Sequence, residues 1–308
     1  MKLRPLILGA GLLIGSGAAS ALNIALTNDD GWSTPGIQAL YDALTAAGHT
    51  VILAGPLDGQ SGSGTAFNIG SLEITRQAEN QYSVALEGGE EGAEPATAGA
   101  IGLSIVQEIT GETPDLLVSG INDGANLAAA TYTSGTVGAA LHAAGLVLGG
   151  QEIPAIAISS DERCAEDAGM TDECMEVAEF LVDYIDYLEQ RPAFVRGSST
   201  LIPFGRALNI NYPPVEPRGV KVARQGKLPQ LGGSLRSIEM GCDGCADLEI
   251  GAAAEGGIRG TTPFEGDEDV TNSDQVLFSD GFITVVVVQP DLSAKANGLK
   301  DYLRAYPD

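Results

Sequence analysis

The sequence predicts an α/β fold with a parallel sheet covered by helices on both faces. Two observations predict it: strand-like and helix-like segments alternate along most of the chain, and the strand-like segments are continuous apolar runs. Such runs are typical of parallel strands that are buried on both faces. With 308 residues, 44% of them hydrophobic, the chain is long and apolar enough to bury a large core.

In the first half of the core, short apolar runs alternate with helical patterns. The runs end in turn-forming or polar residues, which predicts strands at 23–27, 50–55 and 115–120. Apolar or small residues recur at helical spacing in two longer segments, which predicts helices at 36–48 and 96–110. The segments SLEITRQ and QYSVALEG predict a hairpin over 71–88.

The same alternation continues in the second half of the core. A segment rich in glycine and alanine predicts a closely packed helix at 134–149, and PAIAISS predicts a strand at 154–160. Residues 172–190 are acidic but place Val177, Leu181 and other apolar residues on one helical face. The run ALNINYP predicts a strand at 207–213 that enters a proline-rich turn.

Changes in composition divide the chain into four parts. Residues 1–21 form a predicted signal peptide, and 22–217 form the α/β core. Residues 218–281 are rich in glycine and acids, which predicts an extension of hairpins and loops. Residues 282–308 return as a β-branched strand followed by a C-terminal helix.

The N-terminal segment has the features of an export signal. Lys2 and Arg4 precede LILGAGLLIG, an apolar run too short to span a bilayer comfortably, and Ala19-Ser20-Ala21 is typical of a cleavage site. We therefore expect a periplasmic or secreted protein that has no membrane attachment after cleavage. An uncleaved membrane anchor is the alternative.

The net charge limits the partners of this protein. Asp and Glu outnumber Lys and Arg by 41 to 16, so nucleic-acid polymers and anionic membranes would be repelled. A small phosphorylated substrate remains compatible, because a bound divalent cation reverses the local sign of the charge. Most of the acids are expected to form a solvated surface.

The four cysteines form two local pairs, Cys164 with Cys174 and Cys242 with Cys245. In an oxidising compartment such pairs predict two disulfides. A zinc site that uses all four cysteines and a redox role for CDGC are the alternatives.

Polar clusters follow three of the predicted strands. Asp29 and Asp30 come directly after the first strand, Ser61 follows the second, and Asn122 follows the strand at 115–120. The carboxyl ends of parallel strands lie at one edge of a sheet, where ligands bind. Adjacent carboxylates repel each other, and Mg²⁺ or Mn²⁺ with oxygen ligands would compensate that repulsion. By itself, Asp-Asp-Gly is equally compatible with an ordinary turn.

A phosphate site is predicted where TYTSGTVGAALH runs from a loop into a helix. Ser134, Gly135 and Thr136 would form the first helical turn, whose free N–H groups attract anions. The alternative is that Ser134 serves only as an N-cap. The two histidines are expected outside this chemistry, with His49 on the surface and His142 in helix packing.

Five motifs, NDDGWSTPGI, QSGSG, LLVSGINDGAN, YTSGTVGAA and LNINYP, together resemble the SurE family of metal-dependent nucleotidases. The resemblance implies a Rossmann-like three-layer fold, hydrolysis of nucleoside 5′- and 3′-monophosphates, and homodimers or homotetramers. It implies a divalent metal site formed by Asp29, Asp30, Ser61 and Asn122. It also implies that Asn126, Ser134 and Thr136 bind phosphate or take part in catalysis. Asp29 would in addition orient or deprotonate the attacking water.

Two other functions are alternatives to a nucleotidase. One is an exported small-ligand binding protein without catalysis, and the other is a broad phosphatase or exopolyphosphatase. Binding proteins usually have two lobes of similar size, whereas this sequence predicts one core and one irregular extension.

Overall fold

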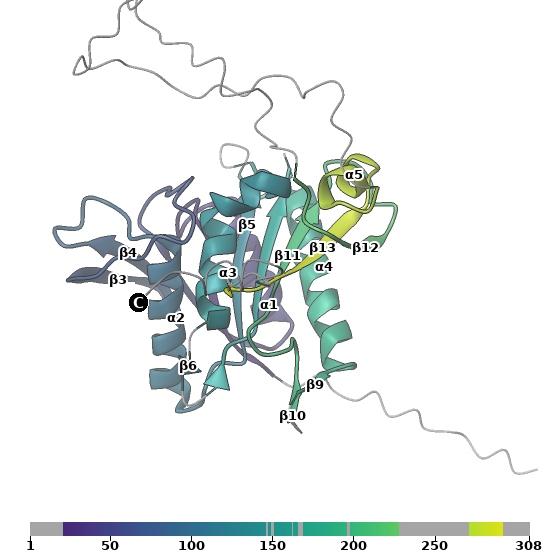
Figure 1. The fold of residues 1–308 in the computed structure, drawn as a ribbon. Coiled ribbons are helices and arrows are strands. Elements are labelled where there is room, and N and C mark those ends of the chain that lie inside the picture. Colours follow the sequence, from purple (N-terminus) through teal and green to yellow (C-terminus); the bar gives the residue numbers. More distant parts are fainter. Residues whose placement is uncertain are drawn as a thin grey trace, which may run out of the picture.

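A nine-stranded sheet forms the centre of the protein (Figure 1). The computed structural model describes residues 21–145, 147–148, 151–161, 163–165, 169–195, 198–227 and 271–291. The strand order across the sheet is β12-β13-β11-β8-β5-β1-β2-β4-β3. The strands are β1 Asn23–Thr27, β2 Thr50–Pro56, β3 Leu72–Ala78, β4 Gln81–Leu86, β5 Leu116–Asp123, β8 Ala155–Ser160, β11 Ala207–Tyr212, β12 Val220–Ala223 and β13 Ile283–Val288.

The sheet is parallel at its centre and mixed at its edges. The strands from β11 to β4 all pair in parallel, as the apolar runs predicted. At one edge, β3 pairs antiparallel with β4 and completes the predicted hairpin. At the other edge, β13 pairs antiparallel with β11 and parallel with β12. The prediction of a parallel sheet is therefore correct for the core, whereas these edge strands reverse direction.

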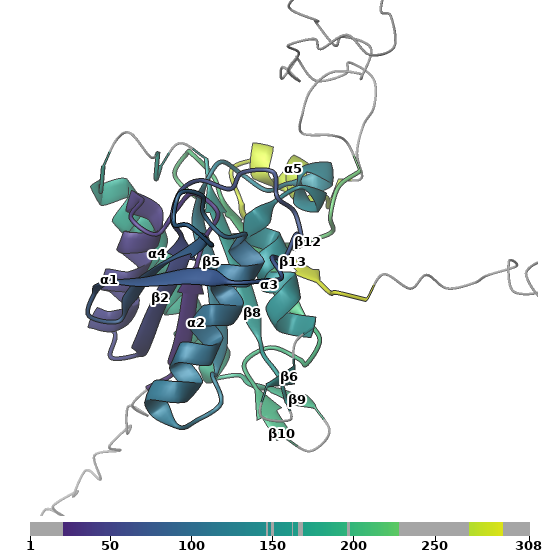
Figure 2. The ribbon, with the colours of Figure 1, turned by 90° about the vertical axis from the view of Figure 1, so that its left-hand side faces the viewer.

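Helices cover both faces of the sheet and complete three layers (Figure 2). Helices α1 (Pro35–Ala46) and α4 (Asp172–Glu189) pack on one face, in the larger apolar cluster. Helices α2 (Pro95–Thr110) and α3 (Gly135–Gly145) pack on the other face. Helices α1, α2 and α4 bury apolar residues at helical spacing, whereas α3 buries mainly glycine and alanine.

Helix α3 is shorter than predicted but lies very close to its neighbours. It ends at Gly145 instead of residue 149, and β6 (Val147–Leu148) then pairs with β7 (Gln151–Glu152). Glycine and β-branched valine are weak helix formers, which explains the early end. A Cβ atom on Gly138 would collide with the carbonyl oxygen of Gly64, so the small residues allow the loop after β2 to touch α3.

The two described segments that flank residues 228–270, here called the roots of the extension, pack on the core: residues 218–227, which include β12, and residues 271–281, which include α5 (Asp274–Ser279). Strand β12 joins the edge of the sheet, and the short helix α5 packs against β13 at the carboxyl edge (Figure 1). Residues 228–270, the predicted signal peptide up to residue 20, Cys242 and Cys245, and the predicted C-terminal helix lie outside the described residues. No helix in the described part of the chain has the length and apolarity needed to span a bilayer.

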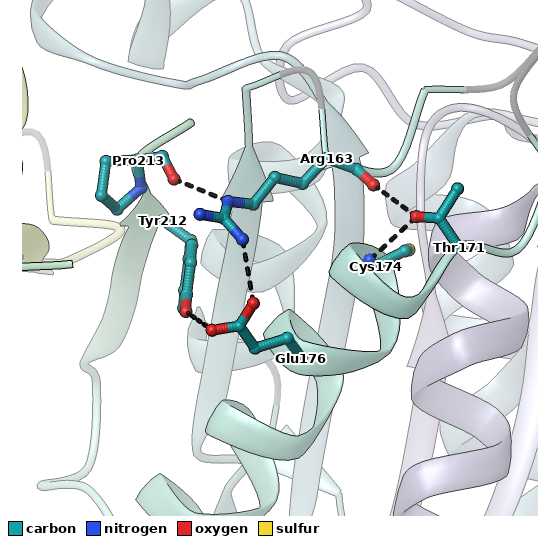
Figure 3. A network of polar contacts seen from close by, with 6 residues as sticks. All are labelled: Arg163, Thr171, Cys174, Glu176, Tyr212 and Pro213. Atoms are coloured by element: carbon teal, nitrogen blue, oxygen red, sulfur yellow. Dashed lines mark hydrogen bonds and ion pairs between the residues drawn. The ribbon is translucent and has the colours of Figure 1, made fainter. Parts of the chain in front are cut away.

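A disulfide and a polar network connect the segment around Arg163 to α4, and Figure 3 shows the polar network. Cys164 is bonded to Cys174, which confirms one predicted disulfide and excludes a zinc site that uses all four cysteines. Beside the disulfide, Arg163 forms a 3.0 Å ion pair with Glu176 and donates to the carbonyl oxygen of Pro213 at 3.0 Å. Tyr212 donates to Glu176 at 3.1 Å. The network therefore ties α4 to the carboxyl end of β11.

The prediction that His49 lies on the surface is wrong. Its side chain is 6% exposed, and its Nδ1 accepts a 3.2 Å hydrogen bond from the backbone N–H of Leu22. The residue follows α1 and precedes β2, and the turn at Gly48 directs it under the start of β1. The burial of His49 thus depends on Leu22, a residue 27 positions earlier in the sequence.

Candidate active site

The side chain of Asn28 shapes the turn that carries the paired acids. Asn28 Nδ2 donates to the carbonyl oxygen of Gly31 at 2.9 Å, and Asn28 Oδ1 accepts from the N–H of Gly31 at 3.2 Å. Gly31 has a φ of +119°, which favours glycine at this position. The turn places Asp29 and Asp30 at the carboxyl end of β1, where they are only 4% and 7% exposed.

Two neighbouring segments contact this acidic turn. The N–H of Gln60, in the loop after β2, donates to the carbonyl oxygen of Asp29 at 2.7 Å. At the end of β5, the N–H of Asp123 donates to Asp30 Oδ2 at 3.1 Å. The segments that carry Ser61 and Asn122 therefore meet the acidic turn, as the sequence predicted.

The four predicted metal ligands differ in their surroundings. Asn122 is 8% exposed, and its Nδ2 donates to the carbonyl oxygen of Gly124. Its other polar side-chain atom, Oδ1, is the one that the predicted ligand role requires. Ser61 lies directly after Gln60 but is exposed. All four side chains offer oxygen, the donor that Mg²⁺ and Mn²⁺ prefer. The described residues contain no cluster of three His, Cys, Asp or Glu side chains suited to a metal.

The surroundings of Asp29 act on its carboxyl group in opposite directions. Burial raises the pKa of its carboxyl group, whereas the Thr136 hydroxyl and the backbone N–H groups of Thr136 and Gly135 act to lower that pKa. A buried carboxylate needs compensation by hydrogen bonds or positive charge. The first turn of α3 supplies the hydrogen bonds, and a divalent cation would supply the charge.

Helix α3 begins beside these acids. Thr136 Oγ1 donates to Asp29 Oδ1 at 2.5 Å, and Thr136 is fully buried. Ser134 Oγ accepts a 3.1 Å hydrogen bond from the N–H of Val137, so Ser134 caps the helix, and whether it also binds phosphate stays a prediction. The cap fixes the start of the helix next to the predicted metal site. Ser134 is 6% exposed and lies at the edge of the sheet where a phosphate would approach.

Asn126 lies at the centre of a buried polar cluster. Its Nδ2 donates to Ser159 Oγ at 2.8 Å and lies 3.5 Å from Thr136 Oγ1. Its backbone is held by the side chains of Asn209 and Asn211 on β11. The structure thus joins three predicted residues, Asp29, Thr136 and Asn126, in one chain of polar contacts.

Sequence reasoning assigns no role to several residues of this cluster. Ser159, Asn209 and Asn211 are fully buried. The available signal is the pair of asparagines that alternates with apolar residues in LNINYP, because buried amides in a central strand require partners. Those partners lie more than 80 positions away, so the motif alone does not identify them.

Asp274, also unassigned from the sequence, holds the segment after Asn126. It is fully buried and accepts hydrogen bonds from the N–H of Ala128 at 3.1 Å and of Gly226 at 2.8 Å. Ala128 begins the 3₁₀ helix η1 (Ala128–Tyr132) with a φ of +47°. Gln225 Nε2 donates to the carbonyl oxygen of Ala128 at 2.9 Å. The roots of the extension are thereby connected to the candidate site.

His142 belongs to packing, as predicted. Its ring stacks on Phe67 with 5.2 Å between the ring centroids, and its Nε2 lies 2.9 Å from the carbonyl oxygen of Thr65. His49 packs at the opposite, amino-terminal end of β1, against Leu22. The site chemistry therefore rests on carboxylates, hydroxyls and amides.

Comparisons with known proteins agree with this geometry. A family model described as survival protein SurE matches residues 24–230. The 5′-nucleotidase SurE of Lawsonia intracellularis is 35% identical over 204 residues, which cover 65% of this chain and 71% of that protein. The 5′-nucleotidase SurE of Gloeobacter violaceus is 33% identical over 210 residues, which cover 67% and 70%. The crystal structure of the SurE protein from Aquifex aeolicus matches with a TM-score of 0.66 and 26% identity, and the match covers 91% of this chain and 99% of that one.

Proposed function

The chain belongs to the SurE family, and we propose that it is a metal-dependent nucleotidase that hydrolyses nucleoside 5′- and 3′-monophosphates to nucleoside and phosphate. The observation that carries the proposal is the juxtaposition of Asp29 and Asp30 with the N-terminus of α3 at the carboxyl edge of the sheet. Paired acids suit a divalent cation, and a helix N-terminus suits a phosphate.

Asp29, Asp30, Ser61 and Asn122 would hold the metal, Mg²⁺ or Mn²⁺. Such a metal, when bound, polarises a phosphoryl oxygen and lowers the pKa of a coordinated water. Around it, Asp29 orients the attacking water or accepts a proton from it. Thr136 fixes one oxygen of Asp29 through its hydroxyl, so the carboxylate keeps one orientation.

The phosphate would be bound beside the start of α3. Thr136 would contribute by holding Asp29, to which its hydroxyl already donates, and the phosphoryl oxygens would be bound by the Asn126 amide and the Ser134 hydroxyl. These groups are neutral donors, so they bind the phosphoryl oxygens without replacing the charge that the metal supplies. Release of nucleoside and inorganic phosphate completes the reaction. The strongly acidic surface does not favour a nucleic-acid polymer as substrate.

A substrate and metal screen tests the proposal. Hydrolysis of nucleoside monophosphates, p-nitrophenyl phosphate, sugar phosphates and polyphosphate is measured with Mg²⁺, Mn²⁺, Ca²⁺ or Zn²⁺ after treatment with EDTA. We expect the highest kcat/KM for a nucleoside monophosphate with Mg²⁺ or Mn²⁺. A preference for polyphosphate or for non-nucleotide esters would support the broad phosphatase instead. Absence of turnover with every metal would support a binding protein.

Matched substitutions localise the activity. Asp29→Asn should reduce hydrolysis at least about 1,000-fold, on the order of the loss of a group used in the transition state. Asp42→Asn removes an exposed carboxylate on α1 and serves as the control. Full activity of the Asp29→Asn protein, or of the EDTA-treated wild type, would refute the proposal.

We further propose that the enzyme acts in the periplasm or outside the cell, as a homodimer or homotetramer. The Cys164–Cys174 disulfide supports an oxidising compartment. Cell fractionation with N-terminal sequencing of the exported protein tests the location. Light scattering coupled to size-exclusion chromatography tests the assembly, and a single species with the mass of one chain would exclude both oligomers.

A further inference from the structure

Two asparagines interrupt the apolar pattern of β11. Asn209 and Asn211 lie between β8 and β13 in the sheet and are fully buried. A buried amide that lacks partners is destabilising, so both side chains need specific hydrogen bonds. In this fold both side chains form hydrogen bonds with Asn126, a residue of the candidate site.

Both asparagines bind the backbone of Asn126. Asn211 Oδ1 accepts from the N–H of Asn126 at 2.6 Å, and Asn209 Nδ2 donates to its carbonyl oxygen at 2.9 Å. Asn211 Nδ2 also lies 3.3 Å from that carbonyl oxygen and 3.4 Å from Asn209 Oδ1. Asn126 lies between β5 and η1, outside any strand or helix. The two side chains therefore satisfy backbone groups that regular secondary structure would otherwise satisfy.

The held backbone in turn directs the side chain of Asn126. Its Nδ2 reaches Ser159 Oγ at 2.8 Å and Thr136 Oγ1 at 3.5 Å, and Thr136 donates to Asp29. Rotation of the Asn126 peptide would break the contact with Ser159 and move the amide away from the start of α3. Because Asn211 makes the shortest contact and binds both backbone groups, its loss would release Asn126 most.

We propose that Asn211, supported by Asn209, is a positioning residue for phosphate ester hydrolysis. It acts through Asn126: it fixes the Asn126 backbone so that the side-chain amide is aimed at the phosphoryl group before substrate binds. The inference rests on the proposed function, because it requires Asn126 to contact the substrate. A displacement of about 1 Å in a catalytic group can reduce the rate about 100-fold, so a positioning residue can influence kcat strongly without touching the substrate.

A double-mutant cycle tests this role. The kcat and KM of wild type, Asn211→Ala, Asn126→Ala and the double variant are measured with a nucleoside monophosphate and Mn²⁺. We expect Asn211→Ala to lower kcat roughly 10- to 100-fold with less than about a threefold change in KM. In the Asn126→Ala background the same substitution should lower kcat less than about twofold, because the residue through which it acts is gone. Equal losses in both backgrounds would overturn the proposal.

Thr284→Val is the matched control, because it also replaces a buried polar side chain beside β11. Thr284 is directly opposite Asn211 on β13, is fully buried, and its Oγ1 has no hydrogen-bond partner in the described part of the chain. This variant should keep the wild-type kcat. A loss equal to that of Asn211→Ala would show that any change in this layer impairs activity, which would overturn a specific role for Asn211.

Two further measurements keep the test decisive if Asn211→Ala does not fold. Asn211→Asp keeps an oxygen that accepts from the Asn126 N–H. Asn209→Ala removes the donor to the Asn126 carbonyl oxygen and the oxygen that lies 3.4 Å from Asn211 Nδ2. Each should fold, as judged by a cooperative thermal transition, and lower kcat less than Asn211→Ala would. Wild-type kcat in both would overturn the positioning role. If the wild type is active and Asn126→Ala has the same activity, the role of Asn126 in the proposed function is refuted.

Discussion

Thr136 Oγ1 donates a 2.5 Å hydrogen bond to Asp29 Oδ1 and so joins the first turn of α3 to the turn after β1. The two residues are 107 positions apart, and Thr136 is fully buried. Together with the backbone N–H groups of Gly135 and Thr136, this bond holds the Asp29 carboxyl group at the start of α3. It explains why a threonine, whose methyl group packs and whose hydroxyl donates, occupies this buried position.

Replacement of Thr136 by valine should therefore impair activity more than it impairs folding. Valine keeps the shape but removes the hydroxyl that donates to Asp29 Oδ1, so the carboxylate is held less firmly. We expect kcat/KM with Mn²⁺ to fall roughly 10- to 1,000-fold, the range seen when a hydrogen bond that orders a catalytic group is lost. Thr136→Ser keeps the donor and should retain most of the activity. Steady-state kinetics of both variants provide the measurement, and equal losses in serine and valine variants would contradict this role.

Local features of the sequence are sufficient to predict the central fold and the acidic turn. Asn28 and Gly31 shape their turn through contacts only three positions apart, and the parallel strands are readable because they are continuously apolar. The direction of β13 could not be predicted in this way. Its β-branched sequence suits either direction, and only its pairing with β11 decides.

The residues that were not predicted act over long sequence distances. Asn211 contacts Asn126 across 85 positions, and Asp274 contacts Ala128 across 146 positions. An isolated polar residue in an apolar strand or a loop carries no information about its partner. His49 illustrates the converse error, because a residue at a helix end is usually exposed, whereas here the start of β1 covers it.

The burial of His49 predicts a dependence of stability on pH. Burial lowers the pKa of its imidazole below the usual value of about 6.5, although Asp186 and Asp115 oppose this shift. As the pH falls below about 6.5, the unfolded chain binds a proton at this residue before the folded protein does. The free energy of unfolding should therefore decrease on acidification, by at most about 1.4 kcal/mol per pH unit from this group.

Urea denaturation between about pH 7.5 and about pH 5.5, the range that brackets the ordinary histidine pKa, measures this effect. His49→Asn keeps an acceptor for the Leu22 N–H but does not titrate, so its unfolding free energy should decrease less than that of wild type. His142→Asn, which makes the same substitution at the partly exposed histidine of α3, is the matched control for the exchange of histidine for asparagine. A His49→Asn protein with the same dependence as wild type would show that carboxylates alone cause it.

Loss of the Cys164–Cys174 disulfide should destabilise the protein. The bond closes a loop of sequence separation 10, for which the chain-entropy model gives roughly 2.5 kcal/mol. The double variant Cys164→Ala/Cys174→Ala should lose about that amount, because the ends of the loop before α4 are no longer joined. Urea denaturation with and without dithiothreitol is the measurement.

A second double variant separates this bond from the remaining cysteine pair. Cys242→Ala/Cys245→Ala leaves the Cys164–Cys174 bond as the one reducible target, and dithiothreitol should still lower its unfolding free energy by about 2.5 kcal/mol. If dithiothreitol destabilised the Cys164→Ala/Cys174→Ala protein by as much as wild type, the stabilising disulfide would be a different one.

Asp274 connects the roots of the extension to the segment that follows Asn126, and its replacement should loosen that segment. Its two carboxylate oxygens accept from the N–H groups of Ala128 and Gly226. In an Asp274→Asn protein the side-chain amide offers only one oxygen and presents an N–H₂ group to the other donor. A buried donor without an acceptor costs roughly 1–3 kcal/mol. Hydrogen exchange should therefore accelerate about 5- to 150-fold at Ala128 or Gly226, whichever of the two amides faces the new N–H₂ group, while exchange in the central strands β1 and β5 stays slow.

An exposed substitution separates this local loosening from a general effect of charge removal. Asp42→Asn, on the surface of α1, also removes one carboxylate and should leave the amides of Ala128 and Gly226 protected. Unchanged protection in Asp274→Asn would show that the other contacts of η1, such as the one from Gln225 to Ala128, are sufficient to hold it. Faster exchange throughout β1 and β5 as well would mean that Asp274 stabilises the whole fold and not this segment in particular, because local opening leaves the central strands protected.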